Sequence, residues 1–210
     1  RPGERPPSSL VDRQLSWLAK RRQRLKPYRV KDFLLREKFR SDYGVIGQFL
    51  VRNLSFDSVY DIGCANGFLL GEFLAADKRC GGIELAPTVR DVLPPELQPL
   101  VEVGDFSSAE GQWDLVCCVE VAEHIPPERS VDLVATVTRL AGSWIYFTAA
   151  PPGQTGRGHI NCRPHQEWLS WFEETGWQEH DALTNRLREE LQELESAPWL
   201  RSNSFVLAKG

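Results

Sequence analysis

The stretch SVYDIGCANG at residues 58–67 limits the possible folds of this chain more than any other feature. A short apolar run ends in Asp61 and then gives way to the small residues Gly63, Ala65 and Gly67. This pattern predicts a buried strand followed by a tight turn, where small residues let the main chain lie against a ligand. A phosphate, a dinucleotide and a sulfonium cofactor are three ligands that such a turn could hold.

From residue 58 onward, short apolar runs alternate with helical patterns. The apolar runs predict strands at 58–63, 80–85, 100–106, 113–121, 143–151 and 203–210. Apolar residues at helical spacing predict helices at 67–76, 128–142, 164–177 and 182–197. Apolar strands that alternate with helices are typical of a parallel sheet covered on both faces. The predicted fold class is therefore α/β, doubly wound and mostly parallel.

The first 45 residues differ from the rest of the chain. Helical patterns begin near Ser9 and again after Asp32. Residues 1–42 hold thirteen Lys and Arg against five Asp and Glu, whereas the other 168 residues hold 12 against 24. This basic arm could attract an anionic substrate or nucleic acid, or it could be a solvated helical face. We predict a basic helical lid at 1–45, mobile rather than part of the core, and a ligand-binding domain at 46–210.

Composition limits the class of protein. Hydrophobic residues make up 41% and charged residues 26%, as in ordinary globular domains. We find no run of about 18 apolar residues and no signal-peptide pattern, so we expect no membrane span. The five cysteines are odd in number and form no CxxC pair. We therefore expect neither a disulfide framework nor a structural zinc site, and a cytoplasmic location.

The residues after Gly63 exclude two of the three ligands. A phosphate-binding P-loop requires Lys followed by Ser or Thr after its glycines, and this chain has Phe68 and Leu69. The dinucleotide pattern G-x-G-x-x-G would require glycine at positions 63, 65 and 68, where the chain has Gly63, Ala65 and Phe68. The bulk of Phe68 would also prevent a pyrophosphate from approaching the main chain.

The remaining pattern is Asp61-x-Gly63-x-Ala65-x-Gly67, with Glu84 at the end of the next strand. It resembles the nucleoside-binding signature of class I S-adenosylmethionine-dependent methyltransferases, which implies a seven-stranded Rossmann-like sheet and S-adenosylmethionine as the cofactor. The resemblance implies that Glu84 accepts the ribose hydroxyls, and that Asp105 accepts from the adenine amino group with Phe106 beside the ring. The segment WDLVCCVEVAEHI resembles the fourth strand of the same family, which runs under the cofactor. The residues assigned to the cofactor are Asp61, Gly63, Cys64, Ala65, Gly67, Glu84, Leu85, Asp105, Phe106 and Glu120.

Methyl transfer to a hydroxyl requires removal of the hydroxyl proton, by a base or with the help of a metal. Glu120-x-x-Glu123-His124 follows the fourth predicted strand, and His159 follows the fifth. This resembles the ExxEH motif and later histidine that hold a divalent metal in ubiquinone-biosynthesis O-methyltransferases and in small-RNA 3′-end methyltransferases. The resemblance implies Mg²⁺ or Mn²⁺ on Glu120, Glu123, His124 and His159. Two alternatives stay open: His159 acts as a metal-free base, with His124 beside it, or the motif only orders its loop.

Three functions fit these patterns. The first is O-methylation of a small-molecule hydroxyl, on a natural product or a sugar. The second is RNA methylation of the metal-dependent 3′-end type, which the basic arm favours. The net negative charge of the 168 residues after the basic arm and an isoelectric point near 5.7 argue against a nucleic-acid partner. The third is a cofactor-binding partner subunit without catalysis.

Overall fold

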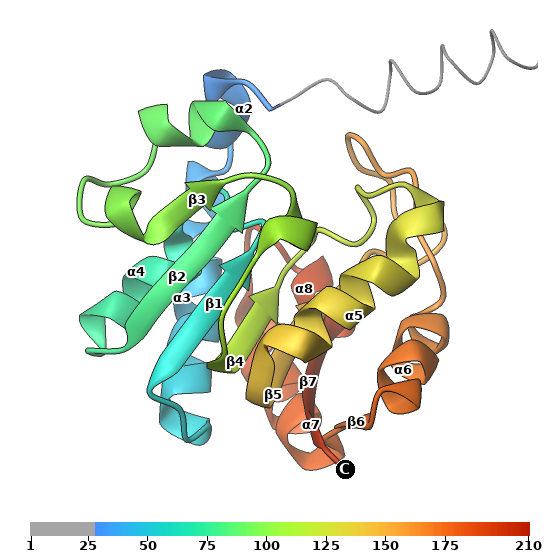
Figure 1. Ribbon diagram of the computed structural model, residues 1–210. Helices are drawn as coiled ribbons and strands as arrows, with labels where there is room; N and C mark the ends of the chain where they lie inside the picture. Colours follow the sequence, from blue (N-terminus) through green and yellow to red (C-terminus); the bar gives the residue numbers. More distant parts are fainter. Residues whose placement is uncertain (1–27) are drawn as a thin grey trace, which may run out of the picture.

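Seven strands form one mixed sheet in residues 28–210, the part of the chain that the computed structural model describes (Figure 1). The strands are β1 (Ser58–Ile62), β2 (Arg79–Glu84), β3 (Val101–Val103), β4 (Trp113–Cys118), β5 (Ala141–Thr148), β6 (Trp177–Glu179) and β7 (Ser204–Lys209). Their order across the sheet is β3-β2-β1-β4-β5-β7-β6. The first five strands are parallel, and β7 runs antiparallel to β5 and β6. This confirms the predicted doubly wound, mostly parallel α/β fold.

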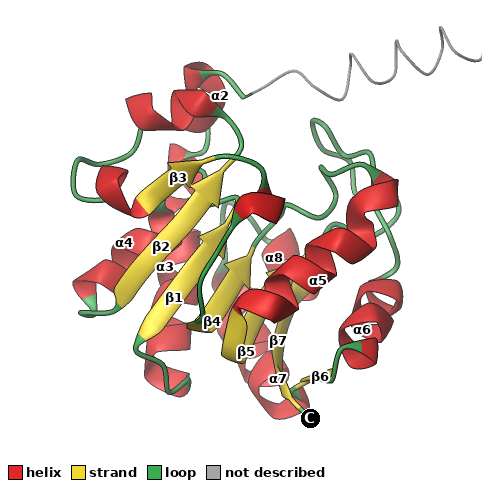
Figure 2. Cartoon of the chain, viewed as in Figure 1, coloured by secondary structure: helices red, strands yellow, loops and turns green. Residues whose placement is uncertain are grey.

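Helices cover both faces of the sheet (Figures 1 and 2). They are α2 (Val30–Leu34), α3 (Arg40–Asn53), α4 (Phe68–Ala75), α5 (Ser130–Leu140), α6 (His165–Glu174), α7 (Asp181–Glu190) and α8 (Trp199–Asn203). Residues of α5 and α6 pack into one apolar cluster, and residues of α3, α4, α7 and α8 pack into the other. The sheet between them is buried on both sides, as its unbroken apolar strands predict.

The central strand β4 buries two of the five cysteines. Leu115, Val116, Cys117 and Cys118 are all 0% exposed. Burial raises the pKa of both thiols well above their usual range, which keeps them protonated. All five cysteines of the chain are free, as expected. Among residues 28–210, no helix is both long enough and apolar enough to cross a membrane.

Two elements near the C-terminus differ from the sequence-based expectation. The helix predicted at 164–177 ends at Glu174, and Gly176, at φ +83°, turns the chain into the short strand β6. The helix predicted at 182–197 ends at Glu190 and continues as a 3₁₀ turn, η6 (Leu191–Glu193). The buried carboxylate of Asp42 in α3 accepts hydrogen bonds from the backbone amides of Ser196 and Ala197, at 3.0 and 2.6 Å. Because these contacts hold 196–197 outside a helix, Pro198 comes before α8 rather than ending the predicted helix.

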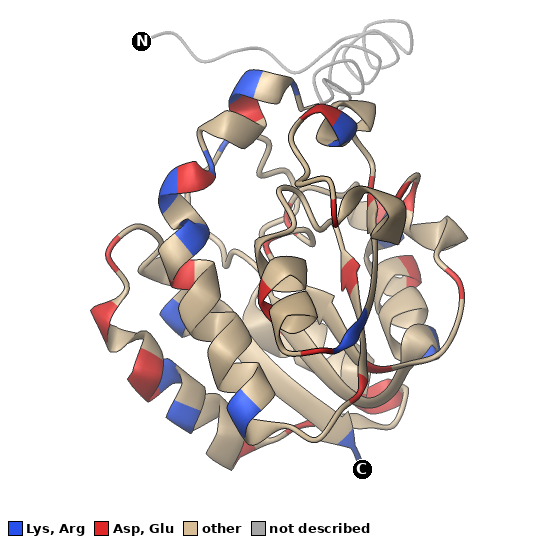
Figure 3. Cartoon of the chain, turned by 90° about the vertical axis from the view of Figure 1, so that its left-hand side faces the viewer, with Lys and Arg blue, Asp and Glu red and all other residues tan. Residues whose placement is uncertain are grey.

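The N-terminal segment begins, within the described residues, with a strap at residues 28–36 that crosses the carboxyl ends of the strands (Figure 1). Phe33 is 1% exposed and belongs to the apolar core. Residues 28–42 hold five Lys and Arg against three Asp and Glu, so the two signs alternate there (Figure 3). Most of the predicted basic excess thus lies in residues 1–27, outside the described residues. The predicted division at residue 45 falls inside α3, and the lid at 1–45 stays a prediction.

Candidate functional site

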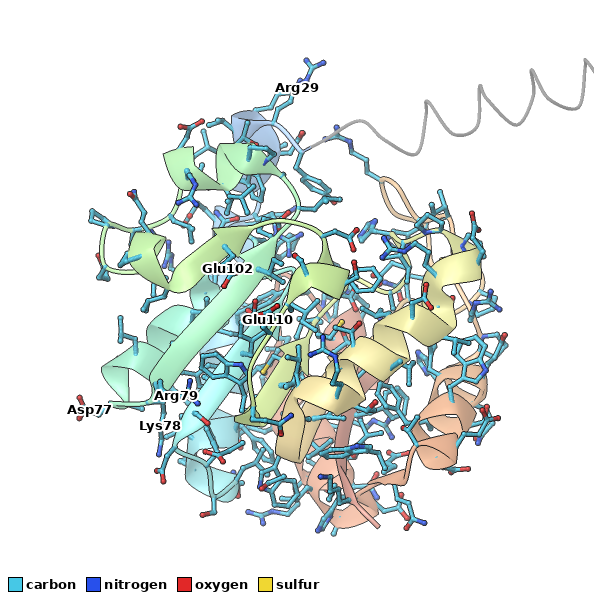
Figure 4. All side chains as sticks on the ribbon, viewed as in Figure 1. Arg29, Asp77, Lys78, Arg79, Glu102 and Glu110 are labelled. Carbon is cyan, nitrogen blue, oxygen red and sulfur yellow. The ribbon has the colours of Figure 1, made fainter. Side chains whose placement is uncertain are left out.

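The candidate site lies where the parallel strands end. Arg29, at the top of Figure 4, marks the strap above this edge, whereas Arg79 marks the opposite edge, where β2 begins. Parallel α/β sheets bind ligands outside the carboxyl ends of their strands. The predicted site residues follow the carboxyl ends of β1 to β5, and the topology therefore gathers them at a single edge.

The glycine loop, residues 63–67, joins β1 to α4 by a close turn over β2. The backbone amides of Gly63 and Cys64 donate to the carbonyl of Ile83, at 2.8 and 3.2 Å. Gly63 has φ +71°, and a Cβ there would lie 2.4 Å from a methyl carbon of Val121. A side chain at position 63 is therefore excluded both by backbone conformation and by space. Cys64 is only 6% exposed, so its contribution to a ligand would come from its main chain.

Glu84 is held in place at the end of β2. Its two carboxylate oxygens accept from the backbone amides of Ala65 at 3.2 Å and Ala86 at 2.9 Å. Burial raises the pKa of Glu84, and these amide hydrogen bonds oppose the rise. The next residue, Leu85, is 65% exposed, which is unusual for a leucine. A carboxylate beside an open apolar side chain suits a ribose and the base attached to it.

Asp61 lies under the glycine loop as a buried carboxyl group. It is 4% exposed, and burial, with the nearby Glu84 charge, raises its pKa to about 8. The guanidinium of Arg36 opposes this rise. Asp61 lines the same small cavity as the glycine loop, and with this raised pKa its carboxyl group is mostly protonated at neutral pH.

Asp105 and Phe106 lie together at the end of β3, but an arginine covers both. The guanidinium of Arg129 donates to both oxygens of Asp105, at 2.7 and 2.8 Å. The same group lies 4.2 Å from the centre of the Phe106 ring. Arg129, followed by the hydrogen bonds from Ser107, lowers the pKa of Asp105 below its usual range. The position that the sequence assigns to adenine is thus shared with Arg129, a residue that the motif did not indicate.

Arg36 reaches this site from the strap. It lines a small cavity beside the glycine loop together with Tyr43, Asp61 and Val119. Its guanidinium donates to the Tyr43 hydroxyl at 3.2 Å, while its buried Nε atom has no hydrogen-bond partner among the described residues. A buried guanidinium nitrogen without an acceptor is costly unless a ligand supplies one. Nothing in the local sequence distinguishes Arg36 from its basic neighbours.

Glu120 lies near Glu123, but its Oε1 atom is bound by two other neighbours. Its backbone has φ +54°, an unusual conformation for a residue with a side chain, and its amide donates to the Thr148 hydroxyl at 2.8 Å. Carboxylate oxygen Oε1 accepts from that hydroxyl at 2.9 Å and from the Asn203 amide at 3.1 Å. Among the described residues, the ligand atoms that converge are those of the other three predicted metal ligands, without Glu120.

Glu123, His124 and His159 do converge. One ligand atom from each lies within 4.8 Å of the others, and Nε2 of His159 lies 3.9 Å from Oε1 of Glu123. Glu123 is 0% exposed, and neither carboxylate oxygen has a hydrogen-bond partner among the described residues. Burial, followed by the nearby Glu120, raises the pKa of Glu123, and burial lowers that of His124 to about 4. An orphaned carboxylate beside two imidazoles fits a divalent ion such as Mn²⁺.

The backbone explains why these three residues meet. The His159 loop, residues 149–164 between β5 and α6, returns to the end of β4, where the amides of Ile160 and Asn161 donate to the Glu123 carbonyl at 2.9 and 3.0 Å. Nδ1 of His159 lies 3.1 Å from the carbonyl oxygen of Gln154, to which it donates. The proton therefore sits on Nδ1, and Nε2 is left with a lone pair that faces Glu123.

Comparisons with known proteins cover part of the chain in sequence and nearly all of it in structure. No family model matches the chain. The ubiquinone biosynthesis O-methyltransferase of Thiobacillus denitrificans is 31% identical over 106 residues, 45% of this chain and 45% of that protein. The chloroplastic magnesium protoporphyrin IX methyltransferase of Arabidopsis thaliana is 29% identical over 108 residues, 48% of this chain and 35% of that protein. The matches thus span less than half of these curated relatives.

The solved structures extend the likeness to the whole fold. Magnesium protoporphyrin IX methyltransferase from Synechocystis PCC 6803 with bound SAH has a TM-score of 0.62 at 15% identity, covering 93% of this chain and 95% of that chain. The glycine loop, the strand order and these relatives agree. The chain is similar to class I S-adenosylmethionine-dependent methyltransferases, in fold over nearly its whole length and in sequence over less than half of it.

Four residues around the motifs were not predicted from the sequence. The strap supplies Arg36 and Tyr28, whose ring stands edge-on to His124 with centroids 6.4 Å apart. Arg129 covers Asp105, and Asn203 reaches Glu120 from the far end of the chain. None of these four belongs to a recognisable motif. Only the folded chain identifies them.

Proposed function

We propose that this chain is a class I methyltransferase, which transfers a methyl group from S-adenosylmethionine to a hydroxyl group of a small molecule. The observation that carries the proposal is that the glycine loop with Glu84 and the cluster of Glu123, His124 and His159 lie at the same edge of the sheet. The first set suits a nucleoside and the second suits activation of an acceptor. The O-methyltransferase names of the relatives support a hydroxyl acceptor.

Residues of this chain suit both the nucleoside and the methionine end of the cofactor. Glu84 would accept from the ribose hydroxyls, with Leu85 against the base and Asp105 at its amino group. Arg36 would bind the carboxylate of the methionine end, which matches its unpartnered Nε. When bound, the cofactor supplies a methyl group on a positively charged sulfur. The protein's tasks are then to align the acceptor with that methyl group and to exclude water.

His159 suits removal of the acceptor proton. Its Nδ1–H donates a hydrogen bond to the Gln154 carbonyl, so Nε2 is free to accept a proton or to bind a metal. With a divalent ion, Glu123, His124 and His159 would hold it, and the ion would lower the pKa of an acceptor hydroxyl. Without an ion, Nε2 of His159 would take the proton directly. The buried, orphaned carboxylate of Glu123 favours the ion.

Methyl transfer with radiolabelled S-adenosylmethionine tests the proposal. We expect label in small phenols or sugars of a cell extract and none in RNA oligonucleotides. A chelator should abolish transfer and Mn²⁺ should restore it if a metal acts. If His159 acts alone as the base, the chelator should have no effect. Label in RNA, or in no acceptor despite bound cofactor, would contradict the proposed acceptor class.

A further inference from the structure

Asn203, the last residue of α8, occupies a fully buried position between two parts of the site. It is 0% exposed, and its side-chain amide nitrogen donates to Oε1 of Glu120 and to Oε1 of Gln154, both at 3.1 Å. Both amide protons therefore have an acceptor. The side-chain oxygen accepts in turn from the Ser202 hydroxyl at 3.4 Å.

The two acceptors belong to the two sides of the site. Glu120 follows β4 in a positive-φ conformation, and its Oε1 atom accepts hydrogen bonds from Thr148 and Asn203. Gln154 lies in the His159 loop, and its backbone carbonyl accepts the Nδ1 proton of His159 at 3.1 Å. Asn203 thus touches Glu120 directly and reaches His159 through Gln154.

The chemistry of this position requires an amide. The half-buried carboxylate of Glu120 and the half-buried side-chain carbonyl of Gln154 both accept hydrogen bonds, and an asparagine offers two protons in one plane. An aspartate of the same shape would have none, and it would place a second negative charge against Glu120. The hydrogen bond to the second ring nitrogen decides which nitrogen of a histidine is free to react.

We propose that Asn203 is a positioning residue, which joins the Glu120 carboxylate to the loop that orients His159. The effect of Asn203 on catalysis rests on the proposed function. Its effect on the His159 tautomer does not. It assigns a role in the site to the C-terminal α8–β7 turn, far from every motif in the sequence. Asn203 is not expected to touch the cofactor or the acceptor.

The test compares Asn203→Asp with wild type and with Asn53→Asp. Asn53 is a matched control because its amide donates to the Phe49 carbonyl and its oxygen accepts from Arg186, away from the site. ¹⁵N NMR of the histidine rings, in protein freed of divalent ions, should show His159 protonated on Nδ1 in wild type and in the control. In Asn203→Asp we expect a mixture of both tautomers and faster amide exchange in residues 154–159.

A second variant keeps the test decisive if Asn203→Asp fails to fold. Gln154→Ala removes the other end of the same link from a loop and should change the His159 tautomer in the same direction. Where transfer can be measured, each variant should lower kcat by about tenfold or more with cofactor affinity within twofold, and the double variant should be no worse than either alone. An unchanged tautomer in both variants overturns the inference. Normal cofactor binding without methyl transfer in wild type would instead count against the proposed function.

Discussion

Asp32 in α2 and Arg157 in the His159 loop form an ion pair that joins the strap to the loop across the site. Asp32 is 4% exposed and also accepts from the Arg29 amide at 2.8 Å. This amide, followed by Arg157, lowers the pKa of Asp32, so it stays charged near neutral pH. The Thr88 hydroxyl adds a second attachment, since it donates to the Tyr28 carbonyl at 2.7 Å. The strap is thus fastened on both sides of the cofactor site.

Asp32→Asn should loosen this fastening. We expect trypsin to cleave after Arg157 several times faster in the variant, because the loop loses its charged partner on α2. Glu190→Gln, which breaks the exposed ion pair between Glu190 and Arg52, is the control and should leave that cleavage unchanged. Saturating S-adenosylmethionine should slow cleavage in both proteins. Equal cleavage of wild type and Asp32→Asn would show that the ion pair does not hold the strap.

Arg129→Met should destabilise the protein in a pH-dependent way. The pair with Asp105 is partly exposed, at 29% and 37%, so solvent screening limits its contribution at neutral pH to about 0.5–1 kcal/mol. Because Arg129 lowers the pKa of Asp105 in the folded protein, its stabilisation is present above the ordinary value of 3.8 and is lost as the pH falls below it. Urea unfolding should separate the two proteins at pH 7 and bring them together near pH 2. A difference that persists in acid would point to packing on Phe106 instead.

Stability should change little between pH 4 and 6.5, where Asp61 and His124 oppose each other, and should fall above pH 6.5. Folding raises the pKa of Asp61 from 3.8 to about 8, so the folded state binds the extra proton and stability falls as the pH rises through this window. Folding lowers the pKa of His124 from 6.5 to about 4, so its contribution rises with pH and is complete above 6.5. Between pH 6.5 and 8 only Asp61 should still titrate, and the free energy of unfolding should fall by about 1–2 kcal/mol. Urea unfolding of the cofactor-free Asp61→Asn protein should show a flatter profile, and an equally steep one would contradict this assignment.

Mn²⁺ should stabilise the wild-type protein by binding Glu123, His124 and His159. At a concentration about 100 times the dissociation constant, the expected rise in melting temperature is about 5–10 °C. Glu123→Gln and His159→Ala should lose most of this rise, whereas Glu102→Gln, an exposed residue of β3, should keep it. Equal rises in all four proteins would mean that the ion binds elsewhere, and no rise in any would favour His159 as a metal-free base.

The sequence predicted the parts of the fold that depend on local pattern. Buried strands such as β4 are unbroken apolar runs, and their alternation with helices indicates a parallel sheet. The end of the predicted helix at 182–197 could not be found in this way, because Asp42, more than 150 residues earlier in the chain, holds 196–197 in another conformation. The short strand β6 was missed for a similar reason, since it exists only through its pairing with β7.

In the site, too, the residues that belong to local patterns were predicted and those that act through distant contacts were not. Gly63 and Glu84 lie in one loop and at the end of the next strand, so their spacing predicts a shared site. Glu123 and His159 meet because two backbone amides of the His159 loop bind the Glu123 carbonyl. Arg36, Arg129 and Asn203 act through contacts between distant segments, and an isolated arginine or asparagine carries no signal in a single sequence. Prediction therefore found the motif residues and missed their partners.

Calorimetric titration with S-adenosylmethionine tests the central claim most directly, together with Glu84→Gln and the matched control Glu102→Gln. The account predicts binding to wild type and to Glu102→Gln with equal affinity. Glu84→Gln should bind about 10- to 100-fold more weakly, because a neutral amide replaces a carboxylate that accepts from the ribose hydroxyls. No binding to wild type, equal affinity in Glu84→Gln, or a preference for a nicotinamide dinucleotide would contradict the account.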